Sequence, residues 1–370
     1  MSQVFYRKYR PKSFSEVIGQ EHVVKTLTNA LKSGAISHGY LFSGPRGSGK
    51  TTMARLLAKA VNCLDLKEFE PCNKCDSCVE INEGRAIDLI EIDAASHRGI
   101  DDIRELKEGI IFSPTKSKYK VFILDEAHQL SKDAANALLK TLEEPPRHAI
   151  FILATTEIHK MIPTIISRCQ HFDFRRLKSP EIIKRLGIIS EKEGIKIEKP
   201  ALELIALNSG GSFRDAESIL DQAATFSSQM GKKETTISVE DLRELLGVVE
   251  MGKISRLVDL LSDKNTAQAI SALNEAFDQG ADLQQLAIEL IGYLHATLMF
   301  KIGGPELHNP LTDGLTDEEF QKLKGQATKF KEEELRRLIN LLLEAQNRMK
   351  SSPILQLPLE LAIAEFCGVE

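Results

Sequence analysis

Short apolar runs alternate with segments of helical periodicity through the first half of the chain. The runs predict strands at 40–44, 87–92, 121–124 and 149–154. A glycine-rich loop follows the first run, and apolar residues every three or four positions then predict a helix over Thr51–Asn62. Because strands that alternate with helices build a mainly parallel sheet, we expect an α/β fold whose sheet closes near Phe172–Phe174.

The second half of the chain shows helical periodicity and no convincing strand. Its first helix is expected to have Ser179 as the N-cap and Pro180 at the first helical position. Helical patterns cover 180–193, 200–209, 212–228, 238–249 and most of 250–370. A loop rich in glycine, proline and asparagine interrupts the last region at 303–314. The pattern therefore predicts a sheet domain followed by helices.

Composition narrows the class of protein. The chain has 370 residues, 42% of them hydrophobic and 27% charged, which is typical of a soluble globular protein with two or three domains. No apolar run approaches the length of a membrane span and the N-terminus has no signal-peptide core, so we expect a cytoplasmic protein without membrane contact. The net charge of −5 excludes an overall positive field, so any contact with nucleic acid needs a local patch or several subunits.

The stretch GPRGSGKT, Gly44–Thr51, fits the phosphate-binding pattern G-x-x-x-x-G-K-[S/T] between a predicted strand and a predicted helix. Its glycines let backbone N–H groups and the helix N-terminus surround phosphates. Lys50 is expected to neutralise the β- and γ-phosphates, and the Thr51 hydroxyl to ligate Mg²⁺. The expected ATP contacts here are Gly44, Pro45, Arg46, Gly47, Ser48, Gly49, Lys50, Thr51 and Thr52.

The apolar run at 121–124 ends in Asp-Glu-Ala-His, a tetrapeptide that also names a class of helicases. After a buried strand, such an acidic pair predicts Asp125 as a second Mg²⁺ ligand and Glu126 as the base that polarises the attacking water. A solvated charge pair at a strand end is the alternative. A helicase of that class has two tandem sheet domains, whereas helices alone are predicted here after residue 175. We therefore expect an ATPase that is not a helicase.

Four of the six cysteines lie close together, directly after the predicted phosphate-loop helix. Cys63, Cys72, Cys75 and Cys78 have the spacing C-x8-C-x2-C-x2-C. Four thiolates at this spacing suit a tetrahedral Zn²⁺ ion in a closed, structural site. The alternative, a pair of disulfides, is uncommon in a cytosolic protein. No histidine is assigned to the chemistry.

Several stretches resemble AAA+ ATPases, and among them the gamma/tau family of bacterial DNA polymerase III clamp-loader subunits. They are YRKYRPKSFSEVIGQEHV (6–23), LLKTLEEPP (138–146), ILATTEIHKMIPTIISRCQHF (152–172) and GGSFRDAES (210–218). The resemblance spans residues 4 to about 225, and the cysteine cluster narrows it to this family. It implies an AAA+ core at 1–178 with a zinc module at 63–78, a helical lid at 179–246, and a helical oligomerisation domain, or collar, at 247–370.

The resemblance also assigns roles to individual residues. Thr155 and Thr156 match the polar sensor that faces the γ-phosphate of ATP. Arg168, in Ser-Arg-Cys, matches the arginine that reaches the ATP site of the neighbouring subunit. Arg214 matches the lid arginine that contacts the ATP phosphates. Contact with DNA is expected at Ser96, His97 and Arg98, which could donate to phosphates, although a plain strand–helix loop is an equal alternative.

The resemblance further implies a set of partners and an activity. A pentameric spiral of clamp-loader subunits binds ATP, opens the sliding clamp, and releases it onto primer–template DNA after hydrolysis. Polymerase and replicative helicase are expected to bind only C-terminal segments beyond Glu370. Two alternatives stay open. A silent scaffold subunit would lack the lysine or the acidic pair, and another AAA+ motor, for branch migration or recombination, would not need the cysteine cluster.

Overall fold

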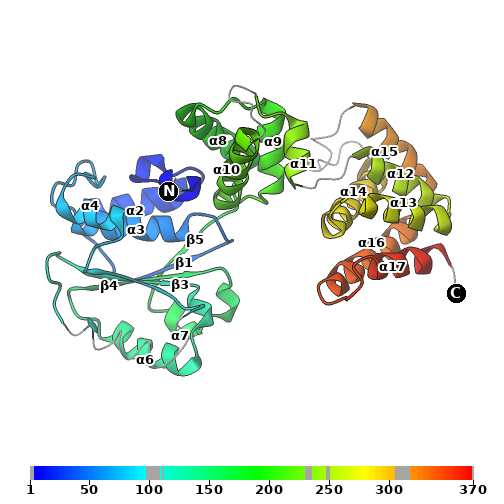
Figure 1. The fold of residues 1–370 in the computed structure, drawn as a ribbon. Helices are drawn as coiled ribbons and strands as arrows, with labels where there is room; N and C mark the ends of the chain where they lie inside the picture. Colours follow the sequence, from blue (N-terminus) through cyan, green and yellow to red (C-terminus); the bar gives the residue numbers. More distant parts are fainter. Residues whose placement is uncertain are drawn as a thin grey trace. The chain divides into compact units, whose positions relative to one another are not determined.

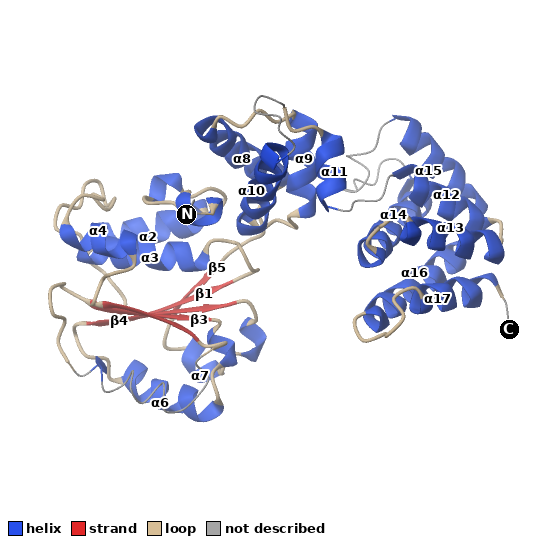
Figure 2. Cartoon of the chain, viewed as in Figure 1, coloured by secondary structure: helices blue, strands red, loops and turns tan. Residues whose placement is uncertain are grey.

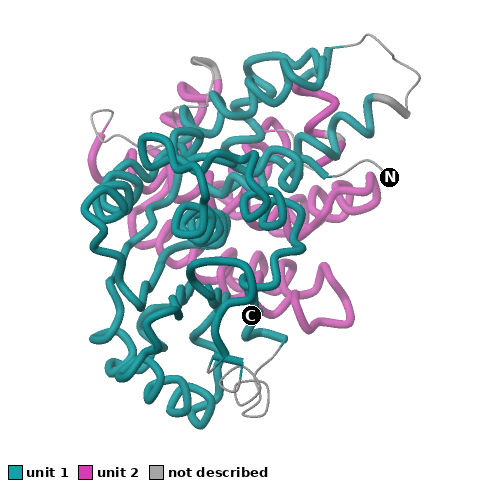
Figure 3. The backbone as a smooth tube through the Cα atoms, turned by 90° about the vertical axis from the view of Figure 1, so that its left-hand side faces the viewer, with its two compact units in different colours: residues 1–238 teal, residues 239–370 magenta. Residues whose placement is uncertain are grey.

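The computed structural model describes residues 4–96, 109–110, 112–229, 236–246, 251–304 and 317–368. The chain forms two compact units, Met1–Ser238 and Val239–Glu370, which Figure 3 colours separately. Each unit is described by itself. The expected division of the first unit into core and lid at residue 178, and the expected start of the collar at residue 247, stay predictions.

A five-stranded parallel sheet forms the centre of the first unit (Figures 1 and 2). Its order is β2-β3-β4-β1-β5. The strands are β1 (Gly39–Ser43), β2 (Leu89–Asp93), β3 (Lys120–Asp125), β4 (Ala149–Thr155) and β5 (Gln170–Asp173). Every residue of β1 and β4 is buried, as continuous apolar runs predict for the inner strands of a parallel sheet. The predicted α/β fold is confirmed.

Helices cover both faces of this sheet. Figure 2 shows α2 (Glu21–Ser33) and α3 (Lys50–Asn62) on one face, and α6 (Lys132–Glu143) and α7 (Pro163–Ile166) on the other. Each face buries its own apolar cluster. The remaining elements of this part are α1 (Phe5–Lys8), η1 (Phe14–Glu16), α4 (Asp76–Glu83), η2 (Ala127–Gln129) and η3 (Ile158–Lys160).

Three helices pack together after the sheet: α8 (Ser179–Glu193), α9 (Lys199–Asn208) and α10 (Phe213–Gln229). The N-cap of α8 was predicted wrongly, because the cap is Lys178 and Ser179 is already helical. The Glu181 carboxylate accepts the Lys178 N–H at 2.8 Å. This contact caps the helix at Lys178, one residue before the predicted N-cap Ser179. In the described residues beyond 175, an isolated bridge between Ile197 and Ile237 is the sole strand-like pairing.

The second unit is helical throughout its described residues. Its helices are α11 (Val239–Leu246), α12 (Met251–Ser262), α13 (Thr266–Asp278), α14 (Leu283–Gly303), α15 (Asp317–Lys329), α16 (Glu332–Met349) and α17 (Leu357–Cys367). Their inner faces share one apolar core. Most of the loop predicted at 303–314 lies outside the described residues.

One expectation about apolar runs was wrong. Among the described helices, α14 alone is long and apolar enough, with 21 residues, to cross a membrane by length and composition. Glu289 and Lys301 interrupt its apolar sequence, which is why the run looked too short. Leu286, Leu290 and Leu294 of this helix are buried in the core of the second unit, as in a central helix of a globular domain.

Candidate active site

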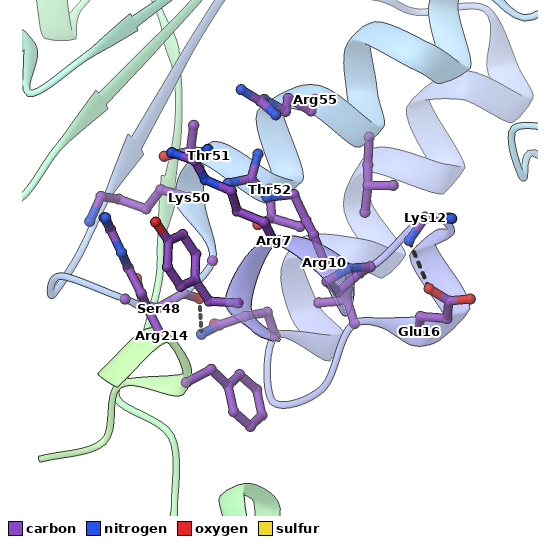
Figure 4. A pocket seen from close by; sticks show the side chains of 18 of the residues that line it. Arg7, Arg10, Lys12, Glu16, Ser48, Lys50, Thr51, Thr52, Arg55 and Arg214 are labelled. Carbon is purple, nitrogen blue, oxygen red and sulfur yellow. Dashed lines mark hydrogen bonds between the residues drawn. The ribbon is translucent and has the colours of Figure 1, made fainter. Parts of the chain in front are cut away.

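A pocket of about 650 Å³ opens at the carboxyl ends of β1 and β3, above the N-terminus of α3. Parallel α/β sheets place their ligand sites at this edge. Figure 4 shows that side chains from the N-terminal segment, the phosphate loop and α10 surround it. The predicted residues Lys50, Thr51, Asp125, Glu126 and Arg214 all line this one pocket.

Two glycines of the phosphate loop have no room for a side chain. Gly44 has φ 142°, and a Cβ there would lie 2.3 Å from the Phe174 carbonyl oxygen. Gly47 has φ 74°, and a Cβ there would lie 1.9 Å from the Ser212 hydroxyl at the start of α10. Glycine tolerates both backbone conformations and both close approaches. The loop is therefore held between the end of β5 and the helical part of the unit.

Lys50 places its charge inside this loop. Its side chain is 6% exposed, and its ammonium donates to the carbonyl oxygens of Gly44 at 2.7 Å and Pro45 at 2.8 Å. Burial lowers the pKa of Lys50, and the carboxylates of Glu126 and Asp125 act in the opposite direction. A buried ammonium beside a glycine-rich loop at a helix N-terminus is suited to bind phosphate oxygens.

Thr51 and Asp125 lie together, as the two predicted Mg²⁺ ligands should. The Thr51 hydroxyl donates to Asp125 Oδ2 at 2.7 Å. A hydroxyl and a carboxylate side by side at a phosphate loop offer the oxygen ligands that Mg²⁺ prefers beside nucleotide phosphates. These two residues fit a Mg²⁺ ion.

Glu126 is held in an uncommon conformation by its neighbours. Its backbone is left-handed, with φ 48° and ψ 43°. Its Oε2 accepts hydrogen bonds from the Thr156 hydroxyl at 2.9 Å and from the Thr156 N–H at 3.3 Å. Strained backbone of this kind costs about 1–3 kcal/mol and persists where the surroundings hold it. Thr156 thus contacts the expected base directly.

His128 is a residue whose position the sequence did not reveal. The Thr155 hydroxyl lies 3.0 Å from its Nδ1, and Glu126 Oε2 lies 3.5 Å from the same atom. The side chain is 6% exposed, and its Nε2 faces Glu157 at 3.4 Å. The histidine therefore packs the ends of β3 and β4 together beside the acidic pair.

The described residues that line the pocket of this chain do not include Arg168. It follows α7 on the opposite face of the sheet, where it donates to Glu143 at 2.6 Å and to the Thr164 carbonyl at 2.9 Å. A third of its side chain is exposed. It contacts no residue of the phosphate loop in the described structure, so a role in this chain's own ATP site has no geometric support.

Part of the expected DNA contact lies outside the described residues. His97 and Arg98 belong to this part. Ser96 is described, and its hydroxyl donates to Asp93 Oδ2 at 3.3 Å, just after β2.

Comparison with known proteins assigns the chain to a family. Family models match in three places: DNA polymerase III, delta subunit, at 19–178; the clamp loader ATPase lid domain at 181–229; and DNA polymerase III subunits gamma and tau domain III at 237–369. The DNA polymerase III subunit gamma of Buchnera aphidicola is 36% identical over 363 residues, which are 98% of this chain and 97% of that protein. The chain belongs to the DNA polymerase III gamma/tau family.

Longer members of the gamma/tau family are also similar. The tau subunit of Bacillus subtilis is 44% identical over 99% of this chain, and that of Escherichia coli is 41% identical over 84%. The matches span 63% and 47% of those proteins. A solved structure of the RuvB branch migration motor of Thermotoga maritima, 19% identical, matches 85% of this chain and 98% of its own with a TM-score of 0.50. At 19% identity, that likeness concerns the fold alone and says nothing about function.

The cysteine cluster of this gamma/tau chain has the geometry of a metal site. The Sγ atoms of Cys63, Cys72, Cys75 and Cys78 lie within 4.8 Å of one another. The Cys72 sulfur accepts the backbone N–H of Cys75 at 3.3 Å. Such N–H groups, first that of Lys74, hold the pKa of the Cys72 thiol at about 6. Burial raises the pKa values of Cys63 and Cys78, so the fit to Zn²⁺ rests on the four converging sulfur atoms, which match the thiolates that this ion binds in tetrahedral sites.

We predict that this cluster binds one Zn²⁺ per chain and supports the fold. Cys72→Ser should lose zinc and lower the melting temperature by about 5–10 °C, because metal binding to the native state is folding free energy and 1 kcal/mol shifts such a domain by about 2–4 °C. Metal analysis and thermal melts of the purified variants measure both. Cys367→Ser, outside the cluster, is the control and should keep zinc. A wild-type protein without zinc would contradict the prediction.

The N-terminal segment of this gamma/tau chain supplies site residues that sequence reasoning missed. Tyr6 lies in the pocket with the Arg214 guanidinium 5.0 Å from its ring centre, a cation–π distance. The Gln20 side chain is buried and donates to the carbonyl oxygens of Ser48, at 3.3 Å, and Arg175, at 2.9 Å. Both residues belong to the stretch 6–23, whose resemblance was noted without roles for individual side chains.

A buried ion pair between α8 and α10 also lines the pocket. Glu217 of α10 is 6% exposed and lies 3.6 Å from the Arg185 guanidinium of α8. Burial raises the pKa of Glu217 to about 7, and Arg185 opposes that shift. Arg185 also donates to the Tyr9 carbonyl oxygen. The helical part is thereby attached to the N-terminal segment next to the pocket.

Proposed function

We propose that this chain is an ATP-hydrolysing motor subunit of a bacterial clamp loader, which opens the sliding clamp and places it on primer–template DNA. The observation that supports this most is the assembly of Lys50, Thr51, Asp125 and Glu126 in one pocket of a gamma/tau chain. A silent scaffold has no use for all four. The cysteine cluster in turn distinguishes the chain from a branch-migration motor of similar fold.

Each side chain has a task in this proposal. The phosphate-loop N–H groups and Lys50 bind the β- and γ-phosphates, and Thr51 and Asp125 hold Mg²⁺. The ion neutralises charge on the phosphates when bound. Glu126 accepts a proton from the attacking water, and Arg214 contacts the phosphates from the helical part. Thr156 contacts Glu126, and Thr155 contacts His128 next to it. In this proposal both threonines report whether a γ-phosphate is present.

The remaining parts of the proposal concern the assembly. Arg168 enters the ATP site of a neighbouring subunit in a pentameric spiral with other clamp-loader subunits. The second unit supplies the helical surface that holds the subunits together. Ser96, His97 and Arg98 contribute to DNA binding in this proposal, and the complex works in the cytoplasm. A direct test measures ATP hydrolysis by the chain alone and with partner subunits, sliding clamp and primed DNA; equal rates would reject the proposal.

Lys50→Ala should weaken nucleotide binding by at least about 100-fold, because it removes a charge-assisted contact to two phosphates from a buried site. Equilibrium titration with a fluorescent ATP analogue measures this. Lys32→Ala, which removes an exposed lysine from α2, is the matched control and should bind like the wild type. The second unit should assemble normally in both variants. If Lys50→Ala bound nucleotide with unchanged affinity, the assignment of Gly44–Thr51 as a phosphate-binding loop would be wrong.

A further inference from the structure

Residues 11–18, here called the lining segment, form one wall of the nucleotide pocket. They contain the short helix η1 and otherwise have no regular structure. The members that line the pocket are Pro11, Lys12, Glu16, Val17 and Ile18. Figure 4 shows Lys12 and Glu16 at the side of the pocket away from Ser48 and Lys50. Something outside the segment must hold it in place, because one turn of helix is not stable by itself.

The Phe14 side chain is buried in the apolar core, and two polar attachments add to this, the first of them made by Glu70. Its Oε2 accepts the Phe14 N–H at 2.6 Å, and its Oε1 accepts the Ser15 N–H at 2.7 Å. These N–H groups begin η1 and have no partner within the helix. Two short hydrogen bonds to one carboxylate are charge-assisted and fix both position and direction. Glu70 stands two positions before Cys72, inside the zinc module at 63–78.

Lys59 makes the second attachment. It lies on α3, its side chain is 2% exposed, and its ammonium donates to the Lys12 carbonyl at 2.9 Å. The same ammonium donates to the side-chain oxygens of Asn82, at 2.8 Å, and Asn73. Asn73 stands between Cys72 and Cys75, and its φ of 58° is one that few residues adopt. A buried lysine thus joins the phosphate-loop helix, the zinc module and the lining segment.

We propose that the zinc module holds the lining segment against the nucleotide pocket through Glu70 and Lys59, so that zinc occupancy sets nucleotide affinity. The inference rests on the proposed nucleotide site. Glu70 and Asn73 belong to the loop that the four cysteines close. When zinc leaves, this loop loses its crosslink, both attachments loosen, and part of the nucleotide's binding energy is spent on ordering the segment. Glu70 and Lys59 are positioning residues in this scheme.

Glu70→Gln tests the first attachment with zinc still bound. An amide cannot accept both N–H groups, because one of its ends is itself a donor. We expect affinity for a fluorescent ATP analogue to fall about tenfold, zinc content to stay at the wild-type value, and hydrogen exchange at the Phe14 and Ser15 amides to accelerate. Glu68→Gln is the matched control, since that carboxylate is exposed in the same loop. Unchanged affinity and exchange in Glu70→Gln would overturn the proposal.

Zinc removal from the wild type provides a second measurement. Chelation should reduce nucleotide affinity at least as much as Glu70→Gln does, because it also loosens the Lys59 attachment. Chelation of Glu70→Gln should then reduce affinity by less than chelation of the wild type does, because the Glu70 attachment is already lost. Fully multiplicative effects, or a zinc-free protein with wild-type affinity, would overturn the inference. The proposed function fails separately: a wild-type protein that binds no nucleotide rejects both, whereas binding that depends on Lys50 but not on Glu70 rejects the inference alone.

Discussion

Arg168→Ala should lower clamp- and DNA-stimulated ATP hydrolysis in the assembled loader by about 10³–10⁵-fold, the range that arginines supplied by a neighbour contribute in other NTPases. Nucleotide binding by the isolated chain should not change. The reason is geometric: Arg168 lies away from its own pocket and pairs with Glu143 on an exposed face. Phosphoryl transfer adds negative charge to the γ-phosphate, and a cation from the next subunit would stabilise it. Single-turnover rates and equilibrium titration measure the two effects.

Two controls distinguish the loss of an arginine at the neighbour's ATP site from a general loss of charge or of assembly. Arg147→Ala removes an exposed arginine near the end of α6 and should leave hydrolysis unchanged. Mixed assemblies should show an order effect, because an Arg168→Ala subunit impairs its neighbour and leaves its own site intact. Wild-type stimulated hydrolysis in Arg168→Ala would disprove the shared site, and so would reduced ATP binding by the isolated variant.

Glu126→Gln should lower hydrolysis by about 10²–10⁴-fold while ATP still binds, since a general base contributes about that factor and an amide cannot take the proton. The amide oxygen can still accept the hydrogen bonds that Thr156 donates at 2.9 and 3.3 Å, so the left-handed backbone at this position should persist. Nucleotide titration together with hydrolysis rates measures both properties.

Glu157→Gln is the control for this prediction. That carboxylate also lies near His128, at 3.4 Å, but it does not line the pocket among the described residues. It should hydrolyse ATP at close to the wild-type rate. If Glu126→Gln kept that rate as well, the base would have to be another group.

The strands and the phosphate loop were predictable because their signals are local. A buried parallel strand is a continuous apolar run, and the loop's chemistry is written in eight consecutive residues, Gly44–Thr51. The N-cap at Lys178 was missed because Glu181 caps that helix from inside it. The apolar stretch of α14 was judged too short for a membrane span because two charged residues interrupt it in the sequence. In the folded protein the helix packs in the core of the second unit.

The rest of the site depends on contacts between distant segments, which no local pattern encodes. Gln20 contacts Ser48 and Arg175, and Glu70 contacts Phe14, across intervals that only the fold closes. The family resemblance predicted that Thr156 faces the γ-phosphate. It did not predict the hydrogen bond from Thr156 to the Glu126 carboxylate. Composition and spacing can identify such residues as candidates, whereas the residues that they contact are known only from the structure.

The register of the parallel sheet limits how the gamma/tau family can diverge. Asp93 pairs with Asp125, and Ser43 pairs with Thr155, so each strand delivers a polar residue to the same edge. Side chains alternate between faces along a strand, so inserting or deleting one residue within β3 would turn Asp125 to the wrong side. In relatives that share fewer than half their residues with this chain, we therefore expect substitutions inside the strands and changes in length only in the loops between them.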